Sequence, residues 1–355
     1  MGFVKKIQRV LTEKFEDSTS KPNFLIYPTL AYTPETKTEV GLSNVFLFYA
    51  NNDRRNRLSE INTFYFYTAE KQYGVWFDHA IYGNEEKWFL LGKGKYQYFP
   101  IKYYGIGIGA PKEGFALVEN SSLQIRERVL RKIARNVFLG AEFDFHKIYN
   151  VSFTGIDPVS YAFPPGAEGT RNVGLGLGVV YDSRKNVLNA RKGVYAELAF
   201  LNYAPRLGSS NSFRSTQFDY RHYAKGLRKD QVLAWQAAGM FNSGDVPFNQ
   251  LALMGGENIM RGYYLGRFRD KNMLAAQVEY RVLPFPFSGR FGTAAFLSTA
   301  TVAPTAKTIL SSPLKFAGGV GARYLIFKSK DIFVRFDVAF TSEGRGYYFY
   351  IGESF

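Results

Sequence analysis

The sequence lacks cysteine and long apolar runs. Its 355 residues contain no apolar stretch of the roughly 18–20 residues that a membrane-spanning helix needs, so such a helix is excluded. The absence of cysteine is compatible with an oxidising envelope compartment and with many others, so it does not place the protein. The mean hydropathy of −0.19 fits a soluble protein. It equally fits a membrane barrel, because every second residue of a barrel strand faces a polar lumen.

Signals for catalysis and cofactor binding are also missing. His79, His146 and His222 lie on separate predicted strands, without a Ser-His or Asp-His spacing. Metal clusters and P-loops are not found, and the glycine runs 105–109 and 174–178 lack the strand-to-helix context of a dinucleotide site. We therefore expect no enzyme activity, no catalytic residue, no metal and no cofactor.

Acidic residues are too few to balance the basic ones, and the net charge is +15. Lys and Arg are spread along the chain, whereas a nucleic-acid binder usually gathers them in one patch or helix, so nucleic acid is not expected as a partner. Basic lumenal surfaces and basic rims facing lipopolysaccharide phosphates account for the charge instead. If the chain forms an outer-membrane barrel, outer-membrane lipids and lipopolysaccharide are its expected partners.

The first twenty residues differ from the rest. Met1-Gly2 leads into charged sequence without an apolar signal core, so a secreted form would be the mature chain. Val4, Ile7, Leu11 and Phe15 share one helical face, with Lys and Arg opposite. This pattern predicts a periplasmic amphipathic helix and linker over residues 1–20. The helix either lies on the membrane, plugs the barrel, or frays as a loose terminus.

From residue 24 onward the apolar period changes to two. In residues 332–341, apolar side chains alternate with a face that carries Arg335 and Asp337, and residues 137–146 and 274–282 follow the same pattern. Most predicted strands reach the roughly 9–11 residues that cross a bilayer at a tilt. They lie near residues 24–33, 36–50, 56–69, 72–83, 86–99, 122–134, 135–148, 172–183, 191–203, 213–223, 231–243, 272–283, 289–302, 314–327, 331–342 and 346–355.

The connections between these strands sort by side. The long ones, near 100–121, 149–171, 244–271 and 303–313, all fall on the same side, and most on the other side are short. Long outer loops, short periplasmic turns and an even strand number are typical of outer-membrane barrels. Residues 21–355 are therefore predicted to form an all-β, transmembrane antiparallel barrel of about sixteen strands, preceded by the short helix.

Two segments are ambiguous or informative. Residues 123–131 can be interpreted as a helix, or as a strand that puts Glu127 on the lipid face. Tyr347, Phe349, Ile351 and Phe355 share one face of the predicted last strand. The terminal Phe355 resembles the assembly signal of outer-membrane barrels, and the acidic residue two positions before it is expected at the membrane interface, where charge costs little.

Three stretches resemble one family of outer-membrane barrels. Residues 254–263, which include Arg261-Gly262-Tyr263, resemble the Arg-Gly-aromatic motif at the tip of the sixth outer loop in the superfamily of BamA, TamA and the two-partner secretion transporters, the bacterial surface antigen family. Residues 318–324 and 334–337 resemble its glycine-rich strand fourteen and the Arg-x-Asp of strand fifteen. Residues 181–193 resemble the periplasmic turn before strand nine.

The resemblance implies that the sixth outer loop, about residues 244–271, folds back into the barrel. The expected lumenal partners of the loop are Glu279, Arg323, Arg335 and Asp337. Ser298 stands where the family usually has the aspartate that receives the loop arginine. Arg261 is then expected to pair with Glu279, Asp337 or Glu257 instead, or the loop is held less firmly. These charged residues also fit plain scaffolding that holds a plug in place.

The resemblance also implies a function in the bacterial outer membrane. Members insert or export proteins, so we expect the barrel to assist insertion or translocation of proteins or lipids through a seam between its first and last strands. Pro28 and Pro34 remove ladder donors in or beside the first strand, and Gly352 loosens the last. Only some twenty residues precede the first strand, so the family's POTRA repeats cannot fit here, and client handling needs a periplasmic or membrane protein partner. The alternative is a passive pore or a structural scaffold for a partner protein.

Overall fold

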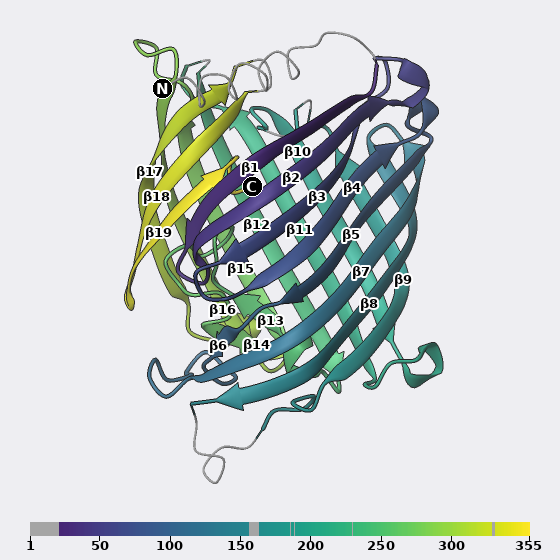
Figure 1. The fold of residues 1–355 in the computed structure, drawn as a ribbon, viewed down its shortest axis with the longest axis vertical. Helices are drawn as coiled ribbons and strands as arrows, with labels where there is room; N and C mark the ends of the chain where they lie inside the picture. Colours follow the sequence, from purple (N-terminus) through teal and green to yellow (C-terminus); the bar gives the residue numbers. More distant parts are fainter. Residues whose placement is uncertain (1–20, 156–162, 185, 188, 229, 329–330) are drawn as a thin grey trace.

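The computed structural model describes residues 21–155, 163–184, 186–187, 189–228, 230–328 and 331–355. In this part of the chain one sheet closes into a barrel (Figure 1). The predicted amphipathic helix, within residues 1–20, lies outside the described residues. None of the helices in the described ranges has the length and apolar character needed to cross a membrane.

Sixteen strands of the described chain form the wall, each antiparallel to its neighbours, and they confirm the predicted barrel. The sheet has seventeen strands because it includes the short strand β6 (Ile101–Tyr103). β6 follows β5 in the chain and pairs with the same neighbour, β7. The wall strands are β1 (Asn23–Thr33), β2 (Lys37–Tyr49), β3 (Leu58–Thr68), β4 (Tyr73–Tyr82), β5 (Trp88–Tyr98), β7 (Ala116–Ala134), β8 (Val137–Thr154), β9 (Thr170–Asp182), β10 (Gly193–Tyr203), β11 (Phe213–Lys225), β12 (Gln231–Gly244), β15 (Asn272–Val282), β16 (Phe291–Ala303), β17 (Lys315–Phe327), β18 (Ile332–Thr341) and β19 (Gly344–Ile351).

The remaining elements are short and lie in connections. They are the strands β13 (Ala252–Met254) and β14 (Phe268–Asp270) and the 3-10 helices η1 (Ala50–Asn52), η2 (Asn84–Glu86), η3 (Pro205–Leu207), η4 (Phe248–Gln250) and η5 (Ala306–Ser311). Because successive wall strands run in opposite directions, the connections alternate between two ends. The long ones, 104–115, 155–169, 245–271 and 304–314, share one end, which we call the loop end. It lies at the bottom of Figure 1, and the opposite end, with its shorter connections, is the turn end.

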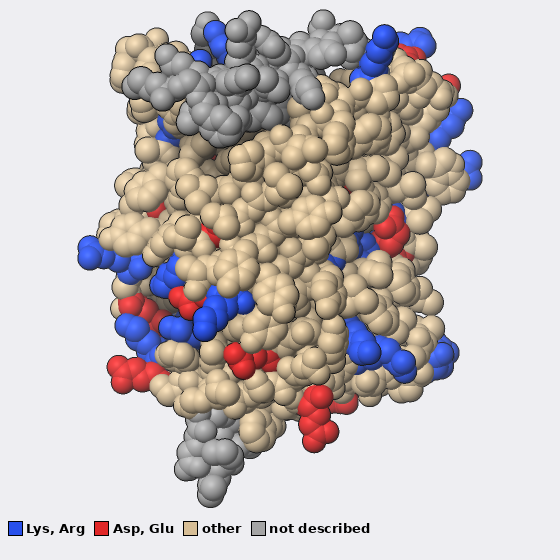
Figure 2. Space-filling view, in the orientation of Figure 1, with Lys and Arg blue, Asp and Glu red and all other residues tan. Residues whose placement is uncertain are grey.

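Alternating side chains give the wall an apolar outside and a mixed inside. On β9, for example, Leu175 and Leu177 are 48% and 62% exposed, whereas Asn172 is buried. Figure 2 shows the outcome as a broad uncharged band across the upper and central part of this face, whereas most of the visible Lys, Arg, Asp and Glu side chains lie in its lower half and along its edges. Such a band is the surface that a barrel presents to lipid.

The ambiguous segment 123–131 is strand, within β7, and Glu127 does face outward. Its carboxylate Oε1 lies 3.1 Å from His79 Nε2 on β4. The two residues flank Gly92 in one cross-strand row. A Cβ at Gly92 would lie 2.1 Å from Glu127 Oε2, so only glycine leaves room for this contact. The outward carboxylate therefore has a polar partner on the barrel surface.

The hairpin of β7 and β8 is longer than predicted. β7 begins at Ala116 instead of near residue 122, and β8 extends to Thr154. The extension is stabilised by packing, because Ala116 and Val118 are buried against Phe248 of the connection between β12 and β15. The sequence pattern does not show this distant contact, so the predicted strands stopped early.

Candidate functional site

The connection between β12 and β15, residues 245–271, is called loop six here, and it folds back into the lumen. β13 and β14 pair with each other at its base. Four of its apolar side chains pack on small inward-facing residues of β15, β16 and β17. These four are Met254, Met260, Tyr263 and Phe268. Apolar packing therefore holds the loop against the C-terminal half of the wall.

Arg261 lies at the tip of loop six and is fully buried. Its Nη1 lies 2.5 Å from Asp337 Oδ2 on β18, and its Nη2 bonds Glu279 Oε2 on β15. The guanidinium carbon lies 3.5 Å from the centre of the Phe296 ring, a cation–π contact. Of the three acids that the sequence left open, Glu279 and Asp337 pair with Arg261. Glu257 instead contributes its backbone carbonyl, which accepts from Arg335 Nη2 at 3.2 Å.

The next two motif residues also contact the last strands. The Gly262 N–H donates to the Tyr348 hydroxyl at 2.7 Å. Gly262 has a φ of 107°, and a Cβ there would lie 2.6 Å from Thr341 Cγ2, so glycine is required on both counts. The Tyr263 hydroxyl lies 3.2 Å from Ser342 Oγ. The loop tip is thus attached to β18 and β19 by backbone as well as by charge.

The predicted lumenal partners converge around Asp337. Arg323 Nη1 lies 2.6 Å from Asp337 Oδ1, and Arg335 Nη1 lies 3.5 Å from Asp337 Oδ2. Together with Arg261, three arginines share this one carboxylate. Buried charges need such partners, because an unpaired buried charge costs several kcal/mol.

Two charged members of the group were not predicted. Arg281 Nε lies 2.7 Å from Glu279 Oε1, and Arg323 Nε lies 2.9 Å from Glu353 Oε2. Glu279-x-Arg281 has the same spacing on one strand face as Arg335-x-Asp337, and this signal could have revealed Arg281. We call the whole group the loop-six cluster. It comprises Arg261, Glu279, Arg281, Arg323, Arg335, Asp337 and Glu353.

The last four residues correct the sequence prediction. β19 ends at Ile351, and Gly352, with a φ of 96°, lets the chain leave the sheet. Glu353 then lies in the loop-six cluster instead of at a membrane interface. Phe355 is buried against Tyr223, Val232 and Ala234, and its carbonyl oxygen accepts from Arg281 Nη2 at 3.1 Å.

The predicted shared face of Tyr347, Phe349, Ile351 and Phe355 is therefore wrong for Phe355. A strand alternates faces only while it stays extended, and the turn at Gly352 ends that alternation. The role of Phe355 as an assembly signal stays a prediction.

A second set of contacts holds loop six at the loop end. Arg267 is bidentate to Glu343, with Nε and Nη2 at 2.6 and 2.8 Å from the carboxylate oxygens. The Leu265 N–H donates to Glu35 Oε1, in the turn between β1 and β2, at 2.6 Å. Burial raises the pKa of Glu35 to about 7, and the nearby Glu257 carboxylate contributes in the same direction.

This shift predicts that the barrel loses stability as the pH rises. An acid whose pKa is higher in the folded state binds its proton more tightly there, so the added stability is complete below the unfolded pKa and is lost as pH rises through about 7. The expected loss between pH 4.5 and 8 is roughly 3 kcal/mol. Glu35→Gln keeps an acceptor for the Leu265 N–H and should reduce the pH dependence. The unfolding temperature, followed by heat-modifiable gel mobility at pH 5 and pH 8, measures this pH dependence. Equal unfolding midpoints of the wild type at the two pH values would contradict the prediction.

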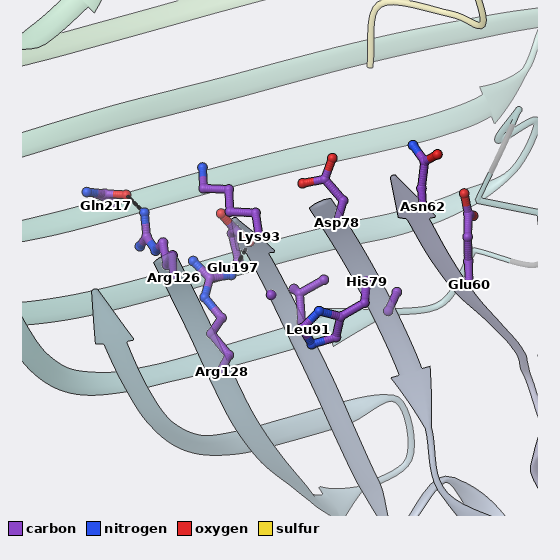
Figure 3. A pocket seen from close by; sticks show the side chains of 12 residues that line it. Glu60, Asn62, Asp78, His79, Leu91, Lys93, Arg126, Arg128, Glu197 and Gln217 are labelled. Atoms are coloured by element: carbon purple, nitrogen blue, oxygen red, sulfur yellow. Dashed lines mark hydrogen bonds and ion pairs between the residues drawn. The ribbon is translucent and has the colours of Figure 1, made fainter. Parts of the chain in front are cut away.

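The N-terminal half of the lumen is less filled. A cavity of about 460 Å³ lies inside β3, β4, β5, β7, β10 and β11. Figure 3 shows its charged lining, which includes Asp78, Lys93, Arg126 and Glu197. In the described ranges, no group of three His, Asp or Glu side chains is arranged to hold a metal ion. The cavity therefore has the mixed polar lining of a barrel lumen.

The junction of the first and last strands is the least paired part of the wall. In the described chain, β1 and β19 share one residue pair in register, Tyr32 with Phe349. By contrast, β1 and β2 share eleven pairs, and β18 and β19 share eight. We call this junction the seam.

Comparison with solved structures finds similar barrels at low sequence identity. BamA from Haemophilus ducreyi lacking POTRA domains 1–3 superposes with a TM-score of 0.60 at 14% identity, over 93% of this chain and 70% of that one. CdiB from Acinetobacter baumannii gives 0.58 at 11%, over 94% and 65%, and CdiB from Escherichia coli gives 0.60 at 9%, over 92% and 62%. The chain thus covers less than two thirds of either CdiB structure. A search of curated proteins finds no match.

The sequence itself matches a family model. Residues 93–355 match the Omp85 superfamily domain. This range is most of the chain and contains loop six and every residue of the loop-six cluster. The match confirms the predicted family, and with it the location in the bacterial outer membrane. The chain belongs to the Omp85 superfamily.

Proposed function

We propose that this barrel assists the insertion or translocation of proteins, or of lipids, across the outer membrane, and that the seam is the working element. The observation that carries the proposal is the single registered pair between β1 and β19. In addition, the last residues turn into the lumen after Ile351, so among the described residues β19 pairs with only one end of β1.

An open edge has a specific chemical consequence in a membrane. Unpaired backbone N–H and C=O groups cost several kcal/mol each in lipid, so the edge of β1 favours pairing with another strand. An incoming chain can supply that strand by β-augmentation. Client handling before this step is assigned to a periplasmic or membrane protein partner. The names BamA and CdiB of the similar structures agree with this function class.

Locking the seam tests the proposal. Tyr32→Cys with Phe349→Cys places two thiols at the registered pair, and directly opposed residues of antiparallel strands have the Cα spacing that a disulfide needs. Because the chain has no cysteine, no other disulfide can form. The oxidised barrel, in vesicles, is expected to lose its acceleration of the folding of a urea-unfolded eight-stranded outer-membrane barrel protein. Reduction should restore it.

The matched control is a disulfide between strands that are already fully paired. Leu30→Cys with Val40→Cys, registered partners on β1 and β2, should leave the acceleration unchanged. Full activity of the oxidised seam variant, with disulfide formation verified by gel mobility, would refute the seam mechanism.

A further inference from the structure

Two like charges lie directly opposite each other on the outside of the barrel. Lys147 on β8 and Arg171 on β9 are cross-strand partners, and both are exposed. Their immediate neighbours Ile148, Thr170 and Asn172 are buried, so the two cations share the outward face. Like charges directly opposite each other destabilise a sheet, so an anion bound between these two cations would stabilise it.

The described part of the chain does not supply that anion. No described carboxylate lies within ion-pair distance of Lys147 or Arg171. Arg171 Nε donates to the Gly208 carbonyl at 2.8 Å, and Lys147 Nζ lies 5.4 Å from the centre of the Tyr149 ring. A third exposed cation, Arg206, lies on η3 in the same connection as Gly208. The local charge is thus positive and open to the outside.

The pair lies at the level of the membrane boundary. Through Leu123, Lys147 is in one cross-strand row with Tyr96. The Tyr149 hydroxyl, on the next row toward the loop end, lies 3.4 Å from the Tyr96 hydroxyl. Outward tyrosines of this kind mark the interface between hydrocarbon and head groups. Lys147 and Arg171 therefore lie at the level of the lipid head groups.

On the side of the pair that faces the turn end, the wall is apolar. Leu175, Leu177 and Phe200 are 48%, 62% and 46% exposed on the outward faces of β9 and β10. A ligand that satisfies both regions has an anionic head and hydrocarbon chains. Phosphate is the head that fits best, because a guanidinium binds it in a bidentate way and a lysine adds a point charge.

We propose that Lys147 and Arg171 bind the phosphate group of a lipid of the outer leaflet, whose acyl chains lie along Leu175, Leu177 and Phe200. This proposal rests on the loop end facing the cell exterior, as in outer-membrane barrels generally. It does not depend on the seam or on any insertion activity. A free phosphate ion would use only the two cations, so the lipid is distinguished by its need for the apolar wall.

Binding of purified lipid A to the barrel in detergent tests the site. Native mass spectrometry with bisphosphorylated lipid A should show bound lipid, and Lys147→Gln with Arg171→Gln should weaken binding roughly tenfold or more. Lys225→Gln, an exposed cation at the turn end, is the matched control and should bind like wild type. The same acylated disaccharide without phosphate should bind as weakly to wild type as lipid A binds to the double variant.

A second variant separates binding from folding. Lys147→Glu places a carboxylate opposite Arg171, so the lipid-free barrel should unfold at a higher temperature while lipid A binding is lost. Equal lipid A binding by wild type and both variants would overturn the proposal. Equal binding of the phosphate-free glycolipid would also overturn it, as would inorganic phosphate at micromolar concentration displacing lipid A.

Discussion

Replacing Arg261 with alanine is expected to release loop six from the lumen and to lower the free energy of unfolding by about 3–5 kcal/mol. The change takes one arginine from each of two fully buried carboxylates, because Arg261 bonds both Glu279 and Asp337. Glu279 keeps Arg281, and Asp337 keeps Arg323. Removing one member of a buried, hydrogen-bonded charge network costs more than the net worth of the pair, because the remaining groups stay buried with fewer contacts.

Urea unfolding, followed by loss of heat-modifiable gel mobility, measures the stability change. Planar bilayer conductance measures the loop, and the small conductance expected for the intact barrel should rise in the variant. Arg261→Lys keeps one charge but cannot span two carboxylates, so an intermediate effect is expected. Arg206→Ala, an exposed arginine, is the control and should change neither quantity. A large, steady conductance in the intact barrel would favour the passive pore over the proposed function.

Gly321→Ala is expected to have an effect of similar size from the other side of the loop-six cluster. A Cβ at Gly321 would lie 1.9 Å from Asp337 Oδ1 and 2.6 Å from Arg323 Nη1. Asp337 would have to move, and in moving it would lose contacts with Arg261 and Arg323. We expect a loss of about 3 kcal/mol or more, measured by the same urea unfolding.

The same strand supplies a matched control. Gly318 lies on the outward face of β17, where a Cβ would lie 2.7 Å from Leu297 Cδ2, the end of a flexible side chain. Gly318→Ala should therefore change stability by less than about 1 kcal/mol. If both variants unfold at the same urea concentration, close packing of the Asp337 carboxylate against Gly321 does not contribute to the stability of the loop-six cluster.

The barrel wall could be predicted from the sequence because the alternation of apolar and polar residues depends on each strand alone. Alternation in residues 332–341 fixes which side chains of β18 face inward, whatever the neighbouring strands are, and the structure agrees over the whole strand. The choice among Glu279, Asp337 and Glu257 as partners of Arg261 was not local. That choice depends on how far the loop tip extends into the lumen and on which inward-facing strand surfaces lie next to the tip. The sequence of a single strand predicts neither.

The same limit explains the errors at the ends of elements. In sequence, Phe355 shares the apolar face of the last strand after an interruption at Glu353, but the left-handed turn at Gly352 and the lumenal site for Phe355 redirect the chain. That site is built by Tyr223, Val232 and Ala234, more than a hundred residues earlier. Apolar alternation cannot distinguish a side chain that faces lipid from one that fills an internal apolar site.

The register of the wall also sets an order of assembly. Every pairing of neighbouring wall strands joins consecutive strands, except that of Tyr32 with Phe349, which are 349 − 32 = 317 residues apart. Consecutive strands can associate one after another as the chain is delivered, whereas ring closure awaits the last strand and carries the entropy cost of the longest loop. Arg261 likewise finds Asp337 only once β18 has arrived. The second carboxylate of Arg261 and the closing of the ring thus both arrive late, and a nascent barrel truncated before β18 would hold Arg261 through Glu279 alone, inside an open sheet.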